Sequence, residues 1–313
     1  MPLNTNTTTS TASTTALNKE YYDRQLLSIA KTKFVHQQFG QKRGIPKNEG
    51  KTVRFRRYEL FTPDIATQRL TEGVTPNGQA LSQTEITATV EQYGAYVSIS
   101  DLLDLTAIDP VIKDANELLG EQLGTVVDWV TRDAMRAGAS VHYVGGGAST
   151  GAITASNIMT IAEIRKAVKT LKKSKARPFP DGYFVCLVDP DVAYDIQNDA
   201  LWKDLAVHAD PERAWKGEIG RLFGVTFVET TEGFVEENAG EGGAAIHHSM
   251  IFGADAYGVI DIAGSGAIKS IVKPHGSGED PLNQRATVGA KVTAYAAKVL
   301  NSLWIIDMQS AAS

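Results

Sequence analysis

The chain has 313 residues, of which 42% are hydrophobic, with a formal net charge of −5 and one cysteine. This length can bury a sizeable core, as one large domain or as two ordinary ones. The sequence has no run of 18 apolar residues to suggest a membrane span, and one cysteine excludes an internal disulfide framework. The mildly acidic balance argues against a protein that wraps nucleic acid over its whole surface.

The first fifty residues have the composition of an arm. Residues 1–16 are mostly Thr, Ser, Asn and Ala, which bury too little to offset the entropy of ordering, so we expect them to be mobile. They also lack the charged start and apolar stretch of a signal peptide. Apolar residues at helical spacing predict a helix within residues 19–40. Gly, Pro and Lys in residues 41–50 predict a connector.

Residues 51–100 alternate apolar and polar side chains in two stretches, as β-strands do. We predict strands over residues 51–60 and 86–100, with the turn-rich stretch 71–82 between them. Two strands joined by a polar tip cannot form a core of their own. We therefore expect this excursion to lie on the body of the chain or on a neighbouring molecule.

Charged residues on this excursion are candidates for contact with another subunit. Arg54, Arg56 and Arg57 occupy a strand without a core of its own, and guanidinium groups suit bidentate contacts with carboxylates. We expect Glu72, in the turn-rich tip, to belong to the same inter-subunit contact.

Residues 109–137 predict one long helix. Asp109 is a good N-cap, Pro110 suits the first helical position, and apolar residues follow at spacings of three and four. At 1.5 Å per residue this helix would be about 40 Å long, which suggests a structural spine.

Residues 154–262 show mixed helix and strand patterns. Thr160 and Glu163 form a capping-box pattern before a helix whose outer face carries a basic stripe from Arg165 to Lys175. The further expected elements are a strand over 183–188, a helix over 189–199, a helix over 211–222, a strand over 225–231, a flexible loop over 232–245, strands within 249–262 and 268–274, and one or two strands within 286–309.

Gly217, Gly220 and Gly224 raise the question of a phosphate-binding loop. A dinucleotide fingerprint needs a strand, then G-x-G-x-x-G, then a helix, and a P-loop needs a following Lys-Ser/Thr pair. The expected order here is helix, glycine, strand. We therefore interpret Gly224 as a helix C-cap and Gly220 as a site of close packing.

Metal-binding patterns are weak in this sequence. The six histidines form no His-Glu-x-x-His motif and no zinc spacing with a cysteine. We interpret His247 and His248 as solvated loop residues. Asp189, Asp191 and Asp195 could bind a metal, yet a helix cap and its first-turn charge explain the first two at least as well.

Catalytic patterns are equally weak. Cys186 lies in an apolar strand, where a buried, inert thiol is expected. The basic stripe from Arg165 to Lys175 could touch nucleic acid, although the solvated face of an amphipathic helix is the commoner interpretation. We expect no catalytic residue, no cofactor and no metal, and we predict that the protein is not an enzyme.

Six segments in order resemble those of tailed-phage major capsid proteins. They are "FGQKRGIPKNEGKTVRFRRYE", "LTEGVTPNGQ", "TATVEQYGAYVSISDLLDLTAIDPV", "GEIGRLFGVTFVETT", "IFGADAYGVIDI" and "DPLNQRATVGAKVTAYAAKVLN". Each segment is weak alone, but the ordered set covers most of the chain after residue 17. The chain resembles the coliphage N-four-type capsid family, which has the Hong Kong ninety-seven-like fold of class α+β.

This resemblance implies a division of the chain into shell-building parts. They are an N-terminal arm over 1–50, an extended β-hairpin loop over 51–100, a peripheral domain with the spine helix over 101–153, an axial domain over 154–285, and C-terminal strands over 286–313 that return to the peripheral domain. The extended loop would lie on the adjacent subunit, and axial domains would meet at five-fold and six-fold axes.

The resemblance also implies a function. The chain would assemble as hexamers and pentamers into an icosahedral shell around a double-stranded DNA phage genome, without sequence-specific DNA binding or membrane contact. It would be made in the host bacterial cytoplasm and reside in the virion, with portal, scaffolding and decoration proteins as candidate further partners. Two alternatives remain open here: an encapsulin-like nanocompartment shell and an ordinary soluble α/β enzyme.

Overall fold

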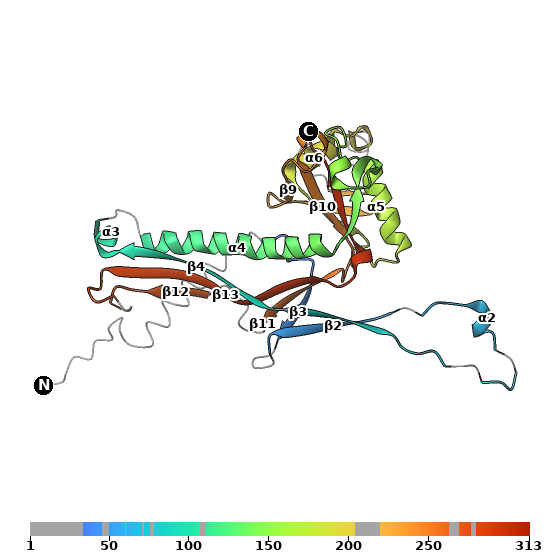
Figure 1. Ribbon diagram of the computed structural model, residues 1–313, viewed down its shortest axis with the longest axis horizontal. Helices are drawn as coiled ribbons and strands as arrows, with labels where there is room; N and C mark the ends of the chain where they lie inside the picture. Colours follow the sequence, from blue (N-terminus) through green and yellow to red (C-terminus); the bar gives the residue numbers. More distant parts are fainter. Residues whose placement is uncertain are drawn as a thin grey trace.

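The protein is described from a computed structural model. The described residues are 34–45, 50–59, 61–70, 72–75, 78–106, 111–203, 220–262, 269–276 and 280–313. Figure 1 shows three parts: an elongated base, a lobe that rises from one end of the base, and a hairpin that projects away from both. None of the helices in these ranges is both long and apolar enough to cross a lipid bilayer.

The base is one long helix packed on one face of a twisted sheet. Helix α4 (Val111–Gly138) has 28 residues, or about 42 Å at 1.5 Å per residue. Its apolar stripe buries Leu119, Leu123 and Val127 against the sheet, as the spacing predicted. The expected caps Asp109 and Pro110 lie outside the described residues. The helix confirms the predicted spine.

The base sheet is organised around one long strand. Its strands are β1 (Gln41–Ile45), β4 (Glu91–Ser100), β11 (Tyr257–Ile262), β12 (Lys269–Lys273) and β13 (Arg285–Val299). Strand β13 pairs with β4 along one edge and with β12 and then β11 along the other, and β1 pairs in parallel with β11. The short helix α3 (Asp101–Thr106) follows β4 at the end of the base that is remote from the lobe (Figure 1).

The lobe is a second sheet covered on one face by two helices. Its strand order is β5–β14–β10–β6–β8–β7, with β9 also paired to β10. These strands are β5 (Ser140–Tyr143), β6 (Phe184–Val188), β7 (Arg221–Leu222), β8 (Val225–Glu229), β9 (Phe234–Glu236), β10 (Ile246–Phe252) and β14 (Ile305–Ser310). Helices α5 (Ile161–Lys173) and α6 (Pro190–Asn198) share a buried cluster with the sheet, and short 3-10 turns span Val144–Gly146, Thr150–Ala152, Glu241–Gly243 and Ser302–Trp304.

Strand β6 connects the cores on the two sides of the lobe sheet. All five of its residues are buried. Cys186 belongs to the cluster under α5 and α6, whereas Val185 and Leu187 belong to the cluster that includes α4. This alternation is the strand period of two. One strand therefore contributes to both cores.

The predicted helix start at Thr160 is half confirmed. The Thr160 hydroxyl accepts a hydrogen bond from the Glu163 N–H (3.4 Å), as an N-cap does. The Glu163 carboxylate does not return to the cap, because it binds Lys166 Nζ at 2.6 Å and His142 Nε2 at 2.9 Å. Burial alone would raise the pKa of Glu163, but these partners outweigh burial and hold the pKa below its usual value.

Two segments expected to be irregular are strands. Residues 41–45 of the expected connector form β1, because the outer edge of β11 offers unpaired backbone groups to a parallel neighbour. The expected flexible loop 232–245 contains β9, which pairs with β10 at residues 246–248. Neither strand has a strong apolar alternation, so sheet pairing rather than local pattern decides both.

The glycine-rich stretch is a tight turn. Gly217 lies outside the described residues, but the helix expected to continue through Leu222 is wrong, since Arg221–Leu222 form β7. Phe223 and Gly224 have φ angles of 47° and 85°, the left-handed pair of a two-residue hairpin turn into β8. Gly224 therefore closes a β-hairpin and is not a helix C-cap.

The sheet pairing changes the expected domain boundaries. Strands β11 and β12 lie in the base sheet, although they fall in the expected axial region 154–285. The expected C-terminal segment 286–313 is shared: β13 belongs to the base and β14 to the lobe. Sequence order does not show these exchanges, because the chain passes between the sheets more than once.

A buried polar group ties residues 34–40 to the base. The His36 N–H donates to Asp128 Oδ1 of α4 (2.8 Å), and His36 Nδ1 lies 2.6 Å from Asp128 Oδ2. The Tyr257 hydroxyl of β11 donates to the His36 carbonyl (2.5 Å). Both His36 and Asp128 are almost fully buried. The helix expected within 19–40 lies mostly outside the described residues, and residues 36–39 form a turn.

We predict that Asp128→Ala lowers the free energy of unfolding by about 3 kcal/mol, because it leaves two buried polar groups of His36 without an acceptor. Urea denaturation of the unassembled subunit measures this change. Asp133→Ala, at an exposed position of the same helix, should stay within about 0.5 kcal/mol of the parent protein. Equal stabilities for the two variants would contradict the role of the buried pair.

Candidate assembly surfaces

The hairpin has a root that rests on its own chain. Strands β2 (Thr52–Tyr58) and β3 (Gln83–Thr89) form an isolated two-stranded ladder. Phe55 of β2 is buried among side chains of the base, including Ile260 of β11 and Leu300. A β-carbon at position 258 would lie 2.6 Å from the Phe55 ring, which is too close. Gly258 therefore allows the ring to pack directly on β11. The root of the hairpin is thus fitted to the base.

The hairpin is shorter than the predicted excursion. The strand expected over residues 86–100 divides at Val90: β3 remains in the hairpin, and β4 enters the base sheet beside β13. The two-stranded ladder and its tip therefore occupy residues 51–90. The predicted alternation is confirmed in both hairpin strands, since Phe55 and Ala88 are buried while Arg54 and Thr87 face outward.

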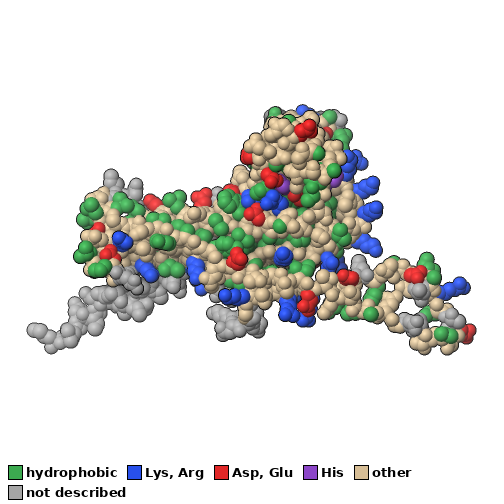
Figure 2. All heavy atoms as spheres, viewed as in Figure 1, with side chains coloured by type: hydrophobic (Ala, Val, Ile, Leu, Met, Phe, Trp, Pro, Cys, Tyr) green, Lys and Arg blue, Asp and Glu red, His purple; other side chains and the backbone are tan. Residues whose placement is uncertain are grey.

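The tip of the hairpin exposes apolar side chains. Five of them between residues 61 and 81 are at least half exposed: Phe61 (52%), Ile65 (90%), Leu70 (72%), Val74 (63%) and Leu81 (64%). The helix α2 (Ile65–Gln68) is a single turn capped by Asp64. Figure 1 shows this tip far from the base and the lobe, and Figure 2 shows apolar groups on its surface. Apolar groups concentrated on so small an element mark an interaction surface.

The structure separates the four predicted contact residues. Arg54 and Arg56 are exposed, and each guanidinium lies 3.5 Å from Glu85 on the facing strand. Arg57 is half-buried and donates to the Leu300 carbonyl (3.2 Å), so it helps to hold the root on its own base. Glu72 is exposed in a turn of the tip. The arginines therefore lie near the root and Glu72 near the tip.

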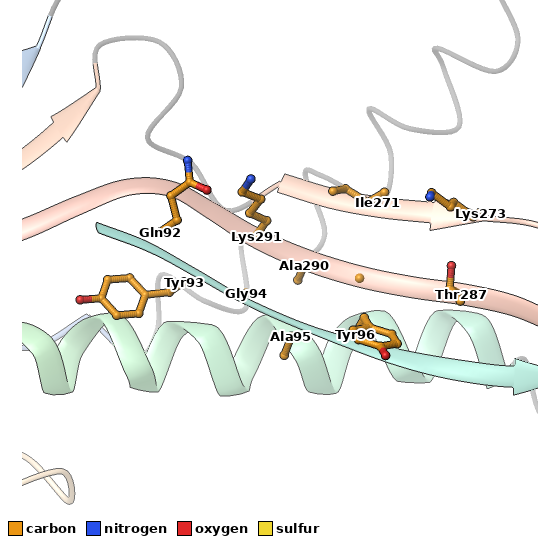
Figure 3. Close-up of a pocket in the computed structure, with 11 residues that line it drawn as sticks. Gln92, Tyr93, Gly94, Ala95, Tyr96, Ile271, Lys273, Thr287, Ala290 and Lys291 are labelled. Atoms are coloured by element: carbon orange, nitrogen blue, oxygen red, sulfur yellow. The ribbon is translucent and has the colours of Figure 1, made fainter. Parts of the chain in front are cut away.

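A groove crosses the face of the base sheet that α4 does not cover (Figure 3). Its volume is about 560 Å³, and its lining comes from β4, β12 and β13. Gly94 and Gly289 leave its centre without side chains, Tyr96 (75% exposed) and Ile271 (42%) supply apolar surface, and Lys273 and Lys291 supply positive charge. This surface suits an extended segment that carries apolar and acidic groups.

Tyr93 borders this groove with its backbone, while its ring packs toward the core on the α4 side of the sheet and is held as a neutral phenol. Burial raises the pKa of Tyr93 to about 12, and its hydrogen bond to Glu91 (3.0 Å) acts in the same direction. The hydroxyl is therefore a hydrogen-bond donor at physiological pH.

A third exposed apolar surface lies at the end of the base that is remote from the lobe. Helix α3 buries none of its residues. Leucines at this end are strongly exposed: Leu102 (67%), Leu103 (48%), Leu105 (84%), Leu118 (67%) and Leu282 (74%). A backbone hydrogen bond from Asp101 to Gln284 joins the start of α3 to the strand-connecting segment before β13.

The histidines pair with carboxylates across the fold. Each histidine within the described ranges has a carboxylate oxygen within 3.6 Å: His36 with Asp128, His142 with Glu163, His247 with Asp189, His248 with Asp307 and His275 with Asp104. The interpretation of His247 and His248 as solvated loop residues is wrong, because both are buried in β10. Sequence spacing gives no sign of these pairs, since most link distant segments.

The three aspartates considered as a metal cluster do not come together. Asp189 stands at the N-cap position of α6, but its carboxylate binds His247 Nδ1 (3.0 Å) and makes no cap bond. Asp195 instead receives hydrogen bonds from Ser313 at the C-terminus. Asp189, Asp191 and His247 have ligand atoms within 4.8 Å of one another, which is compact enough for a cation. The Asp189–His247 hydrogen bond accounts for this grouping without one.

Cys186 is structural. Its side chain is fully buried in β6, and burial raises the pKa of the thiol far above its usual value. The thiol therefore stays protonated and shielded, which is the opposite of a reactive cysteine.

A spine helix on an open sheet, a lobe and a projecting hairpin with an apolar tip together define a shell-building subunit. Similar folds occur in the capsid of Ralstonia phage GP4 (TM-score 0.68, 14% identity, 88% of this chain and 87% of that chain) and of cyanophage P-SCSP1u (0.67, 15%, 90% and 89%). The capsid of cyanophage Pam1 is also similar (0.64, 16%, 85% and 86%). The fold is thus the Hong Kong ninety-seven-like phage capsid fold.

The sequence supports the same conclusion independently. A family model described as phage capsid protein matches residues 115–278, which is 164 of the 313 residues. The chain belongs to the phage capsid protein family and is a structural subunit of a virion shell. A comparison with curated protein sequences finds no match.

We predict that Phe55→Ala loosens the hairpin root. Removing a buried aromatic ring costs about 3–5 kcal/mol in a packed core, so protease cleavage within residues 59–82 should become faster and the unfolding free energy should fall. Tyr58→Ala removes a ring that is 59% exposed in the same strand and should change neither quantity. Matching protease sensitivity in both variants would show that Phe55 is not the anchor.

Proposed function

We propose that this capsid protein is the major subunit of an icosahedral shell around a double-stranded DNA phage genome, and that the hairpin of each copy lies on the base of its neighbour. The observation that carries the proposal is the hairpin tip, where five apolar side chains are exposed away from the chain's own body. Burying a side chain of this size contributes about 1.5–3 kcal/mol. A neighbouring copy supplies the missing cover.

The groove on the open face of the base is the matching seat. The tip carries three acidic residues, Glu59, Asp64 and Glu72, against one basic residue, Arg69. The groove carries lysines beside exposed Tyr96 and Ile271. Opposite charge around an apolar centre is the usual anatomy of a specific interface. The hairpin and groove lie on different parts of the chain, so the contact joins unlike surfaces and can repeat around a closed shell.

The proposed parts follow from this arrangement. The base acts as the peripheral domain, the lobe as the axial domain around five-fold and six-fold axes, and residues 1–50 as an N-terminal arm whose residues 34–45 are anchored in the base. We propose pentamers and hexamers as the ring-shaped units, synthesis in the host bacterial cytoplasm, and membership of the N-four-type group within the phage capsid family. Portal, scaffolding and decoration proteins are further proposed partners, and the subunit has no catalytic role.

Purified particles test the content of the shell. Double-stranded DNA protected from nuclease inside particles made during infection is the expected result. A protein cargo in place of DNA would favour a nanocompartment and contradict the proposal.

We predict that Ile65→Ser combined with Leu70→Ser leaves the subunit folded and abolishes particle formation. Losing two buried apolar side chains costs about 3 kcal/mol or more at every hairpin contact, which is more than about 100-fold in the association constant. Electron microscopy and sedimentation measure assembly, and thermal unfolding measures folding. Gln79→Ala, an exposed polar position of the tip, is the matched control, and closed particles from the double serine variant would refute the docking role.

We predict different effects for the arginines of the hairpin. Arg54→Glu combined with Arg56→Glu should block assembly while the melting temperature of the subunit changes little, because both side chains are exposed. Arg57→Ala should instead make the hairpin more protease-sensitive, because it removes the bond to Leu300. Normal particles from the double variant would exclude a contact role for Arg54 and Arg56.

A further inference from the structure

The lobe has a strongly basic side. Six basic residues follow the outer face of α5 and the turn after it, and all six are exposed: Arg165, Lys166, Lys169, Lys172, Lys173 and Lys175. The single acidic residue of α5, Glu163, is buried and pairs with Lys166 (2.6 Å) and His142, so it offsets one of these six charges and leaves the face strongly basic. Figure 2 shows the Lys and Arg groups along the edge of the lobe where Figure 1 places α5.

The lobe also has an acidic side. Residues 229–241 contain five glutamates and no lysine or arginine. Four of these glutamates are exposed: Glu229 at the end of β8, Glu236 in β9, and Glu237 and Glu241 after β9. The Glu236 carboxylate also lies 3.6 Å from Nε2 of the buried His248. The fifth, Glu232, accepts a hydrogen bond from Trp129 Nε1 of α4 (2.7 Å) and is committed within the chain.

These two sides face in different directions. Helix α5 packs on the face of the lobe sheet that carries Cys186 and Ile251. The glutamate-rich segment lies toward the other face, on the side of α4, where Arg132 donates to the Glu232 carbonyl (3.0 Å). Figure 1 accordingly places α5 and β9 on opposite sides of the lobe.

We infer that lobes of neighbouring copies join head to tail, with the basic face of α5 in one copy against the glutamate-rich segment 229–241 of the next. This inference rests on the proposed ring of axial domains and specifies which surfaces meet. A two-fold contact would set basic against basic and acidic against acidic, whereas a head-to-tail contact pairs opposite charges at every step and closes into a ring. Every copy carries both surfaces, so the ring needs no other partner.

The charges set the geometry and the rate of assembly more than its final strength. Exposed ion pairs contribute little each, but a matched pair of surfaces steers encounter and disfavours wrong orientations. Screening follows from the same physics, since the Debye length falls from about 10 Å at 0.1 M salt to about 3 Å at 1 M. Ring assembly should therefore slow as salt rises.

A reciprocal charge swap tests the pairing. The basic-face variant, on α5 of the lobe, is Lys169→Glu with Lys172→Glu. The acidic-face variant is Glu237→Lys with Glu241→Lys. Each should raise the critical concentration for particle assembly at least about tenfold at low salt. The variant that combines all four changes restores opposite charges in the reverse sense and should assemble close to the parent level. Light scattering and electron microscopy provide the readouts, and thermal unfolding shows that each subunit is folded.

Lys42→Glu with Lys298→Glu is the matched control, because both lysines are exposed on the base sheet outside the groove and the change of net charge is the same. Any assembly defect of that variant should not be repaired by Glu237→Lys with Glu241→Lys. Repair in this control would show that net charge, and not the pairing of these two surfaces, governs assembly, and it would overturn the inference.

Two further outcomes overturn it. Normal assembly of the basic-face variant would show that α5 does not meet another lobe. If neither the basic-face variant nor the fourfold variant assembles, α5 contacts something other than the glutamate-rich segment. Nucleic acid is the alternative, which a DNA-binding assay identifies. A parent protein that never forms closed particles would instead refute the proposed function itself.

Discussion

The organisation of this subunit follows from apolar side chains that the chain does not cover. The hairpin tip, the remote end of the base and the open face of the base sheet all expose large apolar groups. A monomer in water would be expected to bury them or to aggregate. Under the proposed assembly other copies would cover these groups, and their burial would stabilise the shell but not the free subunit.

This arrangement requires a firm root for a projecting element. The hairpin has no second layer of its own, and two strands alone are marginal in water. Its root is therefore fixed by a ring, a glycine and a hydrogen bond: Phe55 on Gly258, and Arg57 on the Leu300 carbonyl. The root belongs to the folding of one chain, whereas the tip is the part that we propose for assembly.

Local patterns in the sequence predicted the parts that fold by local rules. The spine helix, the buried strand around Cys186, the alternation at Phe55 and Ala88, and the Thr160 cap all follow from periodicity or capping chemistry. The capsid fold itself was indicated by resemblance, not by these patterns. Strands β1 and β9 were missed because their pairing partners, not their own residues, determine them.

The contact surfaces were harder to predict. Arg57 lies on the same face of its strand as Phe55, which suggested that it points inward. Its hydrogen bond to Leu300 could not be foreseen, because Leu300 lies where the chain passes from β13 of the base to β14 of the lobe. The histidine–carboxylate pairs join segments that are mostly far apart, so no spacing reveals them. The apolar tip residues were visible in the sequence, but turn residues around them concealed that they would be exposed together.

The connections between base and lobe have a mechanical consequence. The chain crosses between the two sheets through short links after α4, after β10 and after β13, and one apolar cluster contains residues of both parts. Bending at this junction would open packed core, so base and lobe behave as one rigid body. The ribbon of β2 and β3 is anchored to the base only at its root, so under the proposed assembly it would be the compliant element through which identical copies accommodate different local curvature.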